Sequence, residues 1–124
     1  MENFDEKIAV ITGGGTGMGR ELTYQLAAEG CHVSICDVIE ENMEETFQEA
    51  TKKYPQVKIT KHLCDVSSEE DVLRFRDEVL EQQKTEHINL LFNNAGIGGG
   101  ASFVLSGIEE WEKTFIRERQ IRSS

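Results

Sequence analysis

The sequence lacks a long apolar run, since no stretch approaches the roughly 20 residues that a helix needs to cross a membrane. The amino-terminal segment, Met1 to Glu6, is acidic and has no apolar stretch like that of a secretory signal peptide. We therefore expect a cytoplasmic protein with no membrane as partner. The chain has 124 residues, 38% of them hydrophobic, which is enough for one globular domain with a buried core.

Positive charge is also scarce. The chain has 13 Lys and Arg against 23 Asp and Glu, a formal net charge of −10. Such a charge repels phosphate backbones, so we expect no nucleic acid as partner. An anionic cofactor is compatible with it, because backbone N–H groups next to a ligand outweigh a distant net charge.

Cysteine is sparse and lacks the spacing of a metal or redox site. Cys31, Cys36 and Cys64 include no C-x-x-C pair, and each falls in or beside an expected strand. We interpret them as buried, reduced thiols. The three histidines show no metal-ligand spacing with them, so we predict no metal site.

The feature around which the chain is organised runs from Lys7 to Arg20. An apolar run at residues 8–11 leads into Thr12, a glycine cluster and then a helical pattern, which predicts a strand, a tight turn and a helix start. Glycines let backbone N–H groups approach an anion, and the first helical turn adds its own unpaired N–H groups and positive dipole end. A dinucleotide pyrophosphate fits there. The candidate binding residues are Gly13, Gly15, Thr16, Gly17, Met18 and Gly19.

Strand-like segments recur with helical segments between them. Besides residues 8–11, the expected strands are 31–36, 57–64 and 88–92. Strands that alternate with helices at this spacing pair in parallel through right-handed crossovers. We predict an α/β fold, a Rossmann-like doubly wound parallel sheet with strand order 3-2-1-4, incomplete after the fourth strand. The fourth strand would then present a bare apolar edge, through which we expect self-association.

The expected helices carry apolar stripes and end signals. Gly30 ends the first helix and Pro55 the second, while Ser67 with Glu70 has the form of a capping box that opens the third. After a glycine-rich loop, a fourth helix is expected near residue 106. The stripes are Met18, Leu22 and Leu26; Ile39, Met43, Phe47, Ala50 and Tyr54; Val72, Phe75 and Val79; and Ile108, Trp111 and Phe115.

Distinctive residues follow the carboxyl ends of the expected strands, where doubly wound sheets bind ligands. These are the glycine turn, Asp37, the pair Asp65 and Val66, and the segment 93–96. Asp37 lies 18 residues after the last glycine of the turn, close to the spacing at which a carboxylate accepts hydrogen bonds from the adenine ribose. It would repel a 2′-phosphate, so we expect NAD in preference to NADP. The structural alternative for Asp37 is the N-cap of the following helix.

These motifs together resemble the short-chain dehydrogenase/reductase family. The sequence has the family's T-G-x-x-x-G-x-G turn, an acid after the second strand, a D-V pair and an N-N-A-G run in that order, and the resemblance covers residues 7–115. It implies an NAD-dependent oxidoreductase that transfers hydride between the cofactor and a small-molecule alcohol or carbonyl. Thr16 stands where members that prefer NADP often carry Arg or Lys, which again favours NAD.

The resemblance also implies roles for single residues. Asp65 and Val66 match the positions beside the adenine ring, where the carboxylate accepts from the exocyclic amine. The N-N-A-G run would tie strands together through an asparagine amide and pass the adenosine ribose with its backbone, which adds Asn94, Ala95 and Gly96 to the expected cofactor site. For Asn93, a role in the turn alone remains open.

The family's catalytic tyrosine and lysine do not occur in this sequence at the expected place. Their Y-x-x-x-K motif stands well after N-N-A-G, and no tyrosine follows Gly96 here. The one literal Y-x-x-x-K, from Tyr54 to Lys58, precedes the third strand, and Pro55 prevents the helical turn that would align its two side chains. We therefore assign no catalytic residue and expect this chain to be inactive alone.

The end of the sequence departs from the family pattern. Position 118, where an asparagine is usual, holds Glu118, and three of the six arginines of the chain fall within residues 116–124. We interpret residues 1–115 as an NAD-binding Rossmann half-domain and residues 116–124 as a divergent tail, as a frameshift, altered splice or early stop would give.

Two other functions remain open on the sequence. One is a non-catalytic protein that binds NAD or pairs with a family partner. The other is a methyltransferase-type Rossmann domain, which also places an acid after its second strand. The N-N-A-G run and the turn after Thr12 weigh against the second.

Overall fold

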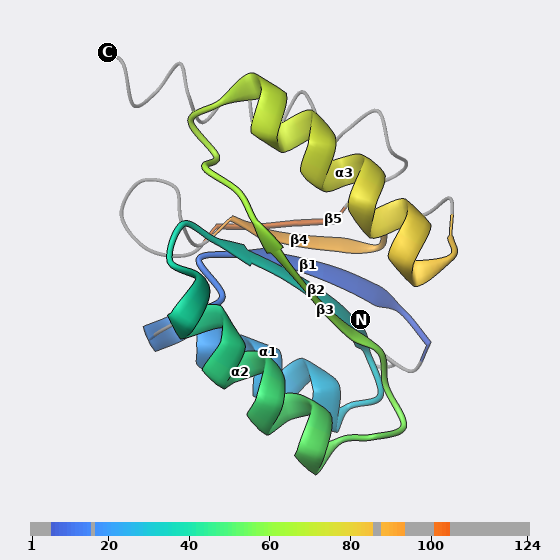
Figure 1. The fold of residues 1–124 in the computed structure, drawn as a ribbon. Coiled ribbons are helices and arrows are strands. Elements are labelled where there is room, and N and C mark those ends of the chain that lie inside the picture. The colour runs from blue at the N-terminus through green and yellow to red at the C-terminus, as the bar shows by residue number, and fades with distance from the viewer. Residues whose placement is uncertain (1–5, 16, 86–87, 94–100, 105–124) are drawn as a thin grey trace.

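The computed structural model describes residues 6–15, 17–85, 88–93 and 101–104 (Figure 1). Within them, five strands form one sheet in the order β3-β2-β1-β4-β5. The strands are β1 (Ile8–Thr12), β2 (His32–Asp37), β3 (Ile59–Leu63), β4 (Leu90–Asn93) and β5 (Ala101–Val104). The helices are α1 (Gly17–Ala28), α2 (Glu40–Lys53) and α3 (Glu69–Gln83). Thr16, Asn94, Ala95, Gly96, the helix expected near residue 106 and the tail 116–124 lie outside the described residues.

The first four strands are parallel, and their order confirms the predicted 3-2-1-4 arrangement. Central β1 pairs with β2 on one side and β4 on the other, so that Ile11 lies between Ile35 and Phe92. All five residues of β1 are buried, as is usual for a parallel strand covered on both faces.

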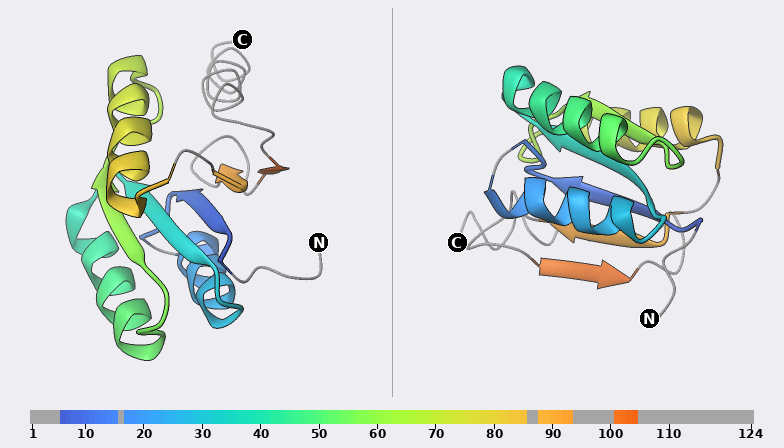
Figure 2. Two further views of the ribbon diagram at one scale, coloured as in Figure 1. Left: turned by 90° about the vertical axis from the view of Figure 1, so that its right-hand side faces the viewer. Right: turned by 90° about the horizontal axis from the view of Figure 1, so that it is seen from below.

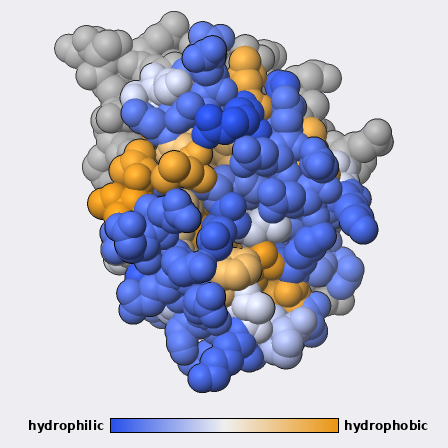
Figure 3. Space-filling view, in the orientation of Figure 1, coloured by the Kyte–Doolittle hydropathy of each residue, from blue (hydrophilic) through white to orange (hydrophobic). Residues whose placement is uncertain are grey.

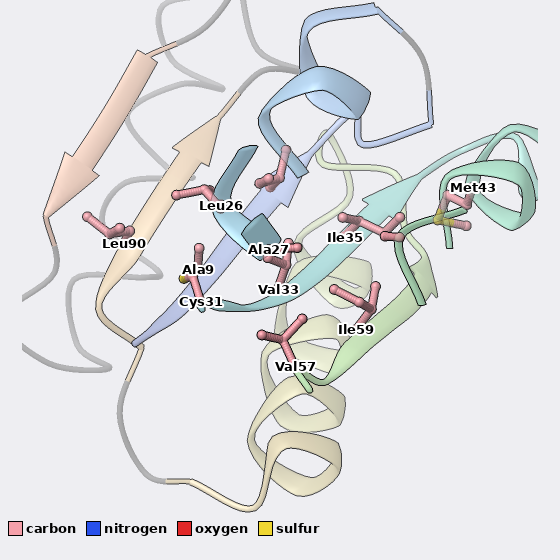
Figure 4. Close-up of a cluster of buried hydrophobic side chains, with 12 residues drawn as sticks. Ala9, Leu26, Ala27, Cys31, Val33, Ile35, Met43, Val57, Ile59 and Leu90 are labelled. Carbon is pink, nitrogen blue, oxygen red and sulfur yellow. The ribbon is translucent and has the colours of Figure 1, made fainter. Parts of the chain in front are cut away.

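Helices cover both faces of the sheet, α1 and α2 on one and α3 on the other (Figures 1 and 2). Alternate residues of each strand divide the core into two clusters, because successive side chains point to opposite faces. Ala9, Ile11, Val33 and Ile35 pack with Leu26 of α1 and with α2 (Figure 4). The opposite cluster joins the sheet to α3, whose buried residues Val72, Phe75 and Val79 confirm the predicted stripe.

The predicted bare edge of the fourth strand is wrong, because β5 pairs with β4 in antiparallel register. Leu90 is opposite Val104 and Asn93 is opposite Ala101, so β5 occupies that edge. No strand is predicted from the sequence at Ala101–Val104, since four residues after the glycines are too few to show a strand period. Self-association through a bare β4 edge is therefore not expected of this fold.

The predicted stripe of α1 is also corrected. Met18 is 57% exposed, and the buried residues of the helix are Gly19, Thr23, Leu26 and Ala27. The first turn lies at the edge of the fold, where Met18 has no core to face, and the Thr23 hydroxyl is satisfied by donating to the Gly19 carbonyl at 2.8 Å. Gly30 does follow the helix, with a φ of +89° that its lack of a side chain permits.

The other helix ends differ from the prediction by a few residues. The second helix ends at Lys53, just before Pro55 as expected, but its first stripe residue, Ile39, is the N-cap and is 46% exposed. The third helix is capped by Ser68 and not by Ser67, because the Ser68 hydroxyl accepts from the Asp71 N–H at 3.3 Å.

Candidate functional site

The glycine turn after β1 packs tightly against β2 and α2. Gly13 has a φ of +68°, which glycine adopts without strain. A Cβ on Gly15 would lie 2.7 Å from Oδ2 of Asp37 and 2.7 Å from Cβ of Asn42, closer than such contacts allow. The turn is fixed to β2 by the Gly14 N–H, which donates to the carbonyl of Cys36 at 3.0 Å. Glycine is therefore required twice in this turn, at Gly13 because of its conformation and at Gly15 because of the close contact with Asp37 and Asn42.

Asp37 ends β2 and holds the glycine turn with its carboxylate. Oδ2 accepts from the Gly15 N–H at 3.0 Å, and Oδ1 accepts from the Val38 N–H at 2.7 Å. The N-cap alternative is wrong, because α2 is capped at Ile39 without a side-chain hydrogen bond. The carboxylate thus lies next to the turn.

A cavity of about 210 Å³ opens where β1, β2 and β3 end. Four of the predicted cofactor residues line it: Gly13, Asp37, Asp65 and Val66. The carboxyl ends of neighbouring parallel strands meet at one edge of the sheet, which is why residues far apart in the sequence converge here. The other three lining residues are not predicted from the sequence; they are Cys36, Val38 and Cys64.

Both cavity cysteines are buried, as the sequence predicted for all three. Burial raises the pKa of the Cys36 thiol well above its usual value, and the neighbouring Cys64 raises it further. Cys36 therefore contributes a neutral thiol to the cavity at neutral pH. The strand alternation placed both residues on the α3 face near the ends of β2 and β3, a signal that could have identified them.

Large apolar side chains are exposed around this end of the sheet. Among the described residues they are Met18, Val38, Ile39 and Leu63. Figure 3 shows an apolar patch on the side of the molecule where β2 ends in Figure 1. An otherwise charged surface with apolar side chains beside a polar cavity is typical of a ligand site.

Asp65 forms a tight turn at the mouth of the cavity. Its Oδ1 accepts from the N–H of Ser67 at 2.9 Å and from the hydroxyl of Ser67 at 2.7 Å. Its carbonyl accepts from the Ser68 N–H at 2.9 Å. Ser67, predicted to cap α3, thus stabilises the turn that carries Asp65 instead.

Arg20 joins the glycine turn to α2, and no motif in the sequence predicts this role of Arg20. Its Nη2 donates to the Gly15 carbonyl at 2.6 Å, and its Nε donates to the hydroxyl of Thr46 at 2.9 Å. Thr46 also donates to the Gly15 carbonyl at 3.2 Å. No local pattern signals this role, because the contact spans 26 residues.

The remaining predicted residues fall into two groups. Gly17, Met18 and Gly19 form the first turn of α1, directly after the glycine turn. Thr16, Asn94, Ala95 and Gly96 are not among the described residues. In the part of the chain that the structure describes, no three His, Cys, Asp or Glu side chains are grouped to hold a metal, and no helix is long and apolar enough to cross a membrane.

Comparison with curated proteins places this arrangement among known dehydrogenases. The chain is 34% identical over 114 residues to epidermal retinol dehydrogenase 2 of Mus musculus, a match covering 92% of this chain and 36% of that protein. It is 35% identical over 96 residues to levodione reductase of Leifsonia aquatica, covering 77% of this chain and 35% of that protein. The chain thus spans about a third of the length of these relatives.

Solved structures share the fold. The crystal structure of levodione reductase has a TM-score of 0.71 at 35% identity and covers 77% of this chain and 36% of its own. NAD+-bound xylitol dehydrogenase has a TM-score of 0.70 at 33% identity, covering 77% of this chain and 35% of its own. The family model described as short chain dehydrogenase matches residues 7–117. This chain belongs to the short-chain dehydrogenase family.

Proposed function

We propose that this chain binds NAD at the carboxyl edge of its sheet and forms the cofactor-binding part of an oxidoreductase. The reaction would transfer hydride between the nicotinamide cofactor and an alcohol or carbonyl substrate. The observation that carries the proposal is the cavity at the strand ends, which brings Gly13, Asp37, Asp65 and Val66 together beside the glycine turn. Similar structures that contain NAD support it, among them NAD+-bound xylitol dehydrogenase.

The phosphates of the cofactor would bind at the start of α1. The N–H groups of its first turn have no partners within the helix, and that turn contains no acidic residue to repel an anion. Gly17, Met18 and Gly19 would contribute there together with Gly13, Gly15 and Thr16 of the turn. Asn94, Ala95 and Gly96 stay predictions for the ribose side of the site.

The preference for NAD over NADP would come from Asp37. Its carboxylate lies at the wall of the cavity, where it would accept hydrogen bonds from ribose hydroxyls and repel a 2′-phosphate. The seven residues that line the cavity include no lysine or arginine to neutralise such a phosphate. Removing this carboxylate should therefore reduce the discrimination between the two cofactors.

Bound NAD would supply the hydride acceptor, while the residues described here bind and orient it. A general acid or base is needed for alcohol–carbonyl chemistry, and the tyrosine that serves in the family has no counterpart after Gly96 in these 124 residues. We therefore propose that this chain alone binds the cofactor without catalysing the reaction, and that its NAD affinity is weaker than low-micromolar.

Isothermal titration of the chain with NAD and NADP tests the proposal. We expect NAD to bind with a Kd above the low-micromolar range and NADP to bind more weakly still. Asp37→Ala should weaken NAD binding by about 10-fold and narrow the difference between the cofactors, because it removes charged acceptors from the ribose. Glu41→Ala, which removes an exposed carboxylate of α2, is the matched control.

Three outcomes would count against the proposal. A chain that binds neither dinucleotide at millimolar concentration overturns it, and tighter binding of NADP overturns the role of Asp37. Low-micromolar NAD binding would contradict the expected weak affinity. S-adenosylmethionine serves as a negative control, since the methyltransferase alternative predicts that it stabilises the chain in a thermal-shift assay and NAD does not.

A further inference from the structure

The turn that carries Asp65 is held from α3 by Asp71. Oδ2 of Asp71 accepts from the Asp65 N–H at 3.0 Å. The Asp71 N–H in turn donates to the hydroxyl of Ser68, the N-cap of the helix. Asp71 therefore joins the start of α3 to Asp65, one of the residues that line the cavity.

Arg74, one turn further along α3, holds Asp71 in place. Its Nη1 lies 3.2 Å from Oδ1 of Asp71, so each carboxylate oxygen has its own partner. Its Nη2 donates to the carbonyl of Leu63, the last residue of β3. Arg74 thus spans the segment just before Asp65 and the side chain that fixes Asp65.

Arg74 is also linked, through Glu78, to a buried side chain of β3. Its Nε lies 3.4 Å from Oε2 of Glu78, and Oε1 of Glu78 lies 2.8 Å from Nδ1 of His62, a buried side chain. A planar guanidinium with several fixed donors holds such an arrangement better than a flexible ammonium. The Asp65 turn is therefore linked through Arg74 and Glu78 to the buried His62.

A second cavity, of about 310 Å³, adjoins the first and includes Asp71 and Arg74 in its lining. The two cavities share Val38, Cys64 and Asp65. Asp71 and Arg74 thus lie beside the cavity proposed to bind NAD without lining that cavity themselves.

We propose that Asp71, held by Arg74, is a positioning residue for adenine recognition and acts through Asp65. This inference rests on the proposed NAD site. Asp65 would accept from the exocyclic amine of adenine only if its backbone is held where the hydrogen bond with Asp71 places it. The Asp71 side chain is 30% exposed and that of Arg74 is 49% exposed, and ion pairs this accessible contribute little to stability. A role in positioning can therefore be separated from a role in folding.

The test compares NAD with nicotinamide hypoxanthine dinucleotide, in which an oxo group replaces the adenine amine. We expect the unsubstituted chain to prefer NAD in titrations followed by amide chemical shifts. Asp71→Ala should reduce that preference about 3- to 10-fold, as expected for a misplaced hydrogen bond, and Arg74→Ala should reduce it in the same direction. Asp71→Asn keeps an acceptor oxygen and should restore part of the preference.

Matched controls come from the same helix. Asp77 and Arg76 pair with each other at 3.1 Å, away from the Asp65 turn, so Asp77→Ala and Arg76→Ala remove the same charges without touching it. We expect both to keep the preference for NAD. Loss of affinity for both dinucleotides by an equal factor in Asp71→Ala would indicate a purely structural role and overturn the inference.

The failure of this inference is distinct from failure of the proposed function. If the chain binds neither dinucleotide, the NAD site itself is wrong. If it binds NAD but shows no preference over the hypoxanthine analogue, the role of Asp65 in adenine recognition is wrong, and that of Asp71 with it. If the preference is the same in Asp71→Ala, only the role of Asp71 is wrong. If Asp71→Ala does not fold, the role of Asp71 is tested by comparing Asp71→Asn and Arg74→Ala with the control variants Asp77→Ala and Arg76→Ala.

Discussion

At the scale of single residues, His62 is a buried base among polar partners on the α3 face of the sheet. Its Nδ1 lies 2.8 Å from Glu78, and its Nε2 lies 2.8 Å from the hydroxyl of Thr60. Thr60 in turn contacts the hydroxyl of Ser34 at 2.5 Å, and Gln83 of α3 donates to that hydroxyl. Burial lowers the pKa of His62. The positive charges of Lys61 and Arg74 lower this pKa further, whereas Glu78 raises it.

This lowered pKa makes stability depend on pH. The unfolded chain, with a histidine pKa of about 6.5, binds the proton more readily than the folded one. The contribution of His62 to the free energy of unfolding should therefore be constant above about pH 6.5. It should fall as the pH is lowered through the folded-state pKa of His62. We expect His62→Gln to reduce the dependence of the free energy of unfolding on pH, measured by urea denaturation at several pH values. His32→Gln, which changes a partly exposed histidine, is the control, and an unchanged slope in His62→Gln would contradict the assignment.

At the scale of elements, the start of α3 distinguishes two neighbouring serines. Ser68 caps the helix, whereas Ser67 bonds to Asp65. Loss of an N-cap side chain costs about 0.5–2 kcal/mol, so we expect Ser68→Ala to lower the free energy of unfolding by about 1 kcal/mol. Ser67→Ala should cost less, because its backbone N–H still donates to Asp65. The reverse order in urea denaturation would support the capping box read from the sequence.

Sequence patterns predicted the arrangement of the strands but not where the core ends. Strand order followed from the alternation of strands and helices, and Asp37 and Asp65 were identified because strand ends converge in this fold. The exposure of Met18 was not predicted, since periodicity says which residues share a face but not where the core ends.

Contacts between side chains and backbone groups limit the prediction of the site. Arg20, Asp71 and Arg74 act through backbone groups of Gly15, Asp65 and Leu63, which lie outside the helices that carry the three side chains. Neither residue type nor spacing reveals such partners, because a carbonyl or N–H is present at every position. The sequence therefore predicted residues that line the cavity but not those that hold them.

At the scale of the whole molecule, β5 covers the edge that the sequence had left bare. Leu91 is opposite Phe103 and Phe92 is opposite Ser102 in the antiparallel pair. Successive N–H groups of a strand point to opposite sides, so one of residues 102 and 103 directs its N–H toward β4. Proline at both positions removes that donor whichever one it is.

We therefore expect the double substitution Ser102→Pro and Phe103→Pro to uncover β4 and to promote association of the chain with itself. An edge with apolar side chains and unpaired N–H and C=O groups pairs readily with a second copy, and Leu90 and Leu91 are both buried in the intact fold. Sedimentation velocity at increasing concentration measures the change, with Ser102→Ala and Phe103→Ala together as the control that keeps both N–H groups. If the proline variant sediments like the control at every concentration, pairing with β5 is not what keeps the β4 edge from associating, and the protection must come from the charge of −10 that every copy carries.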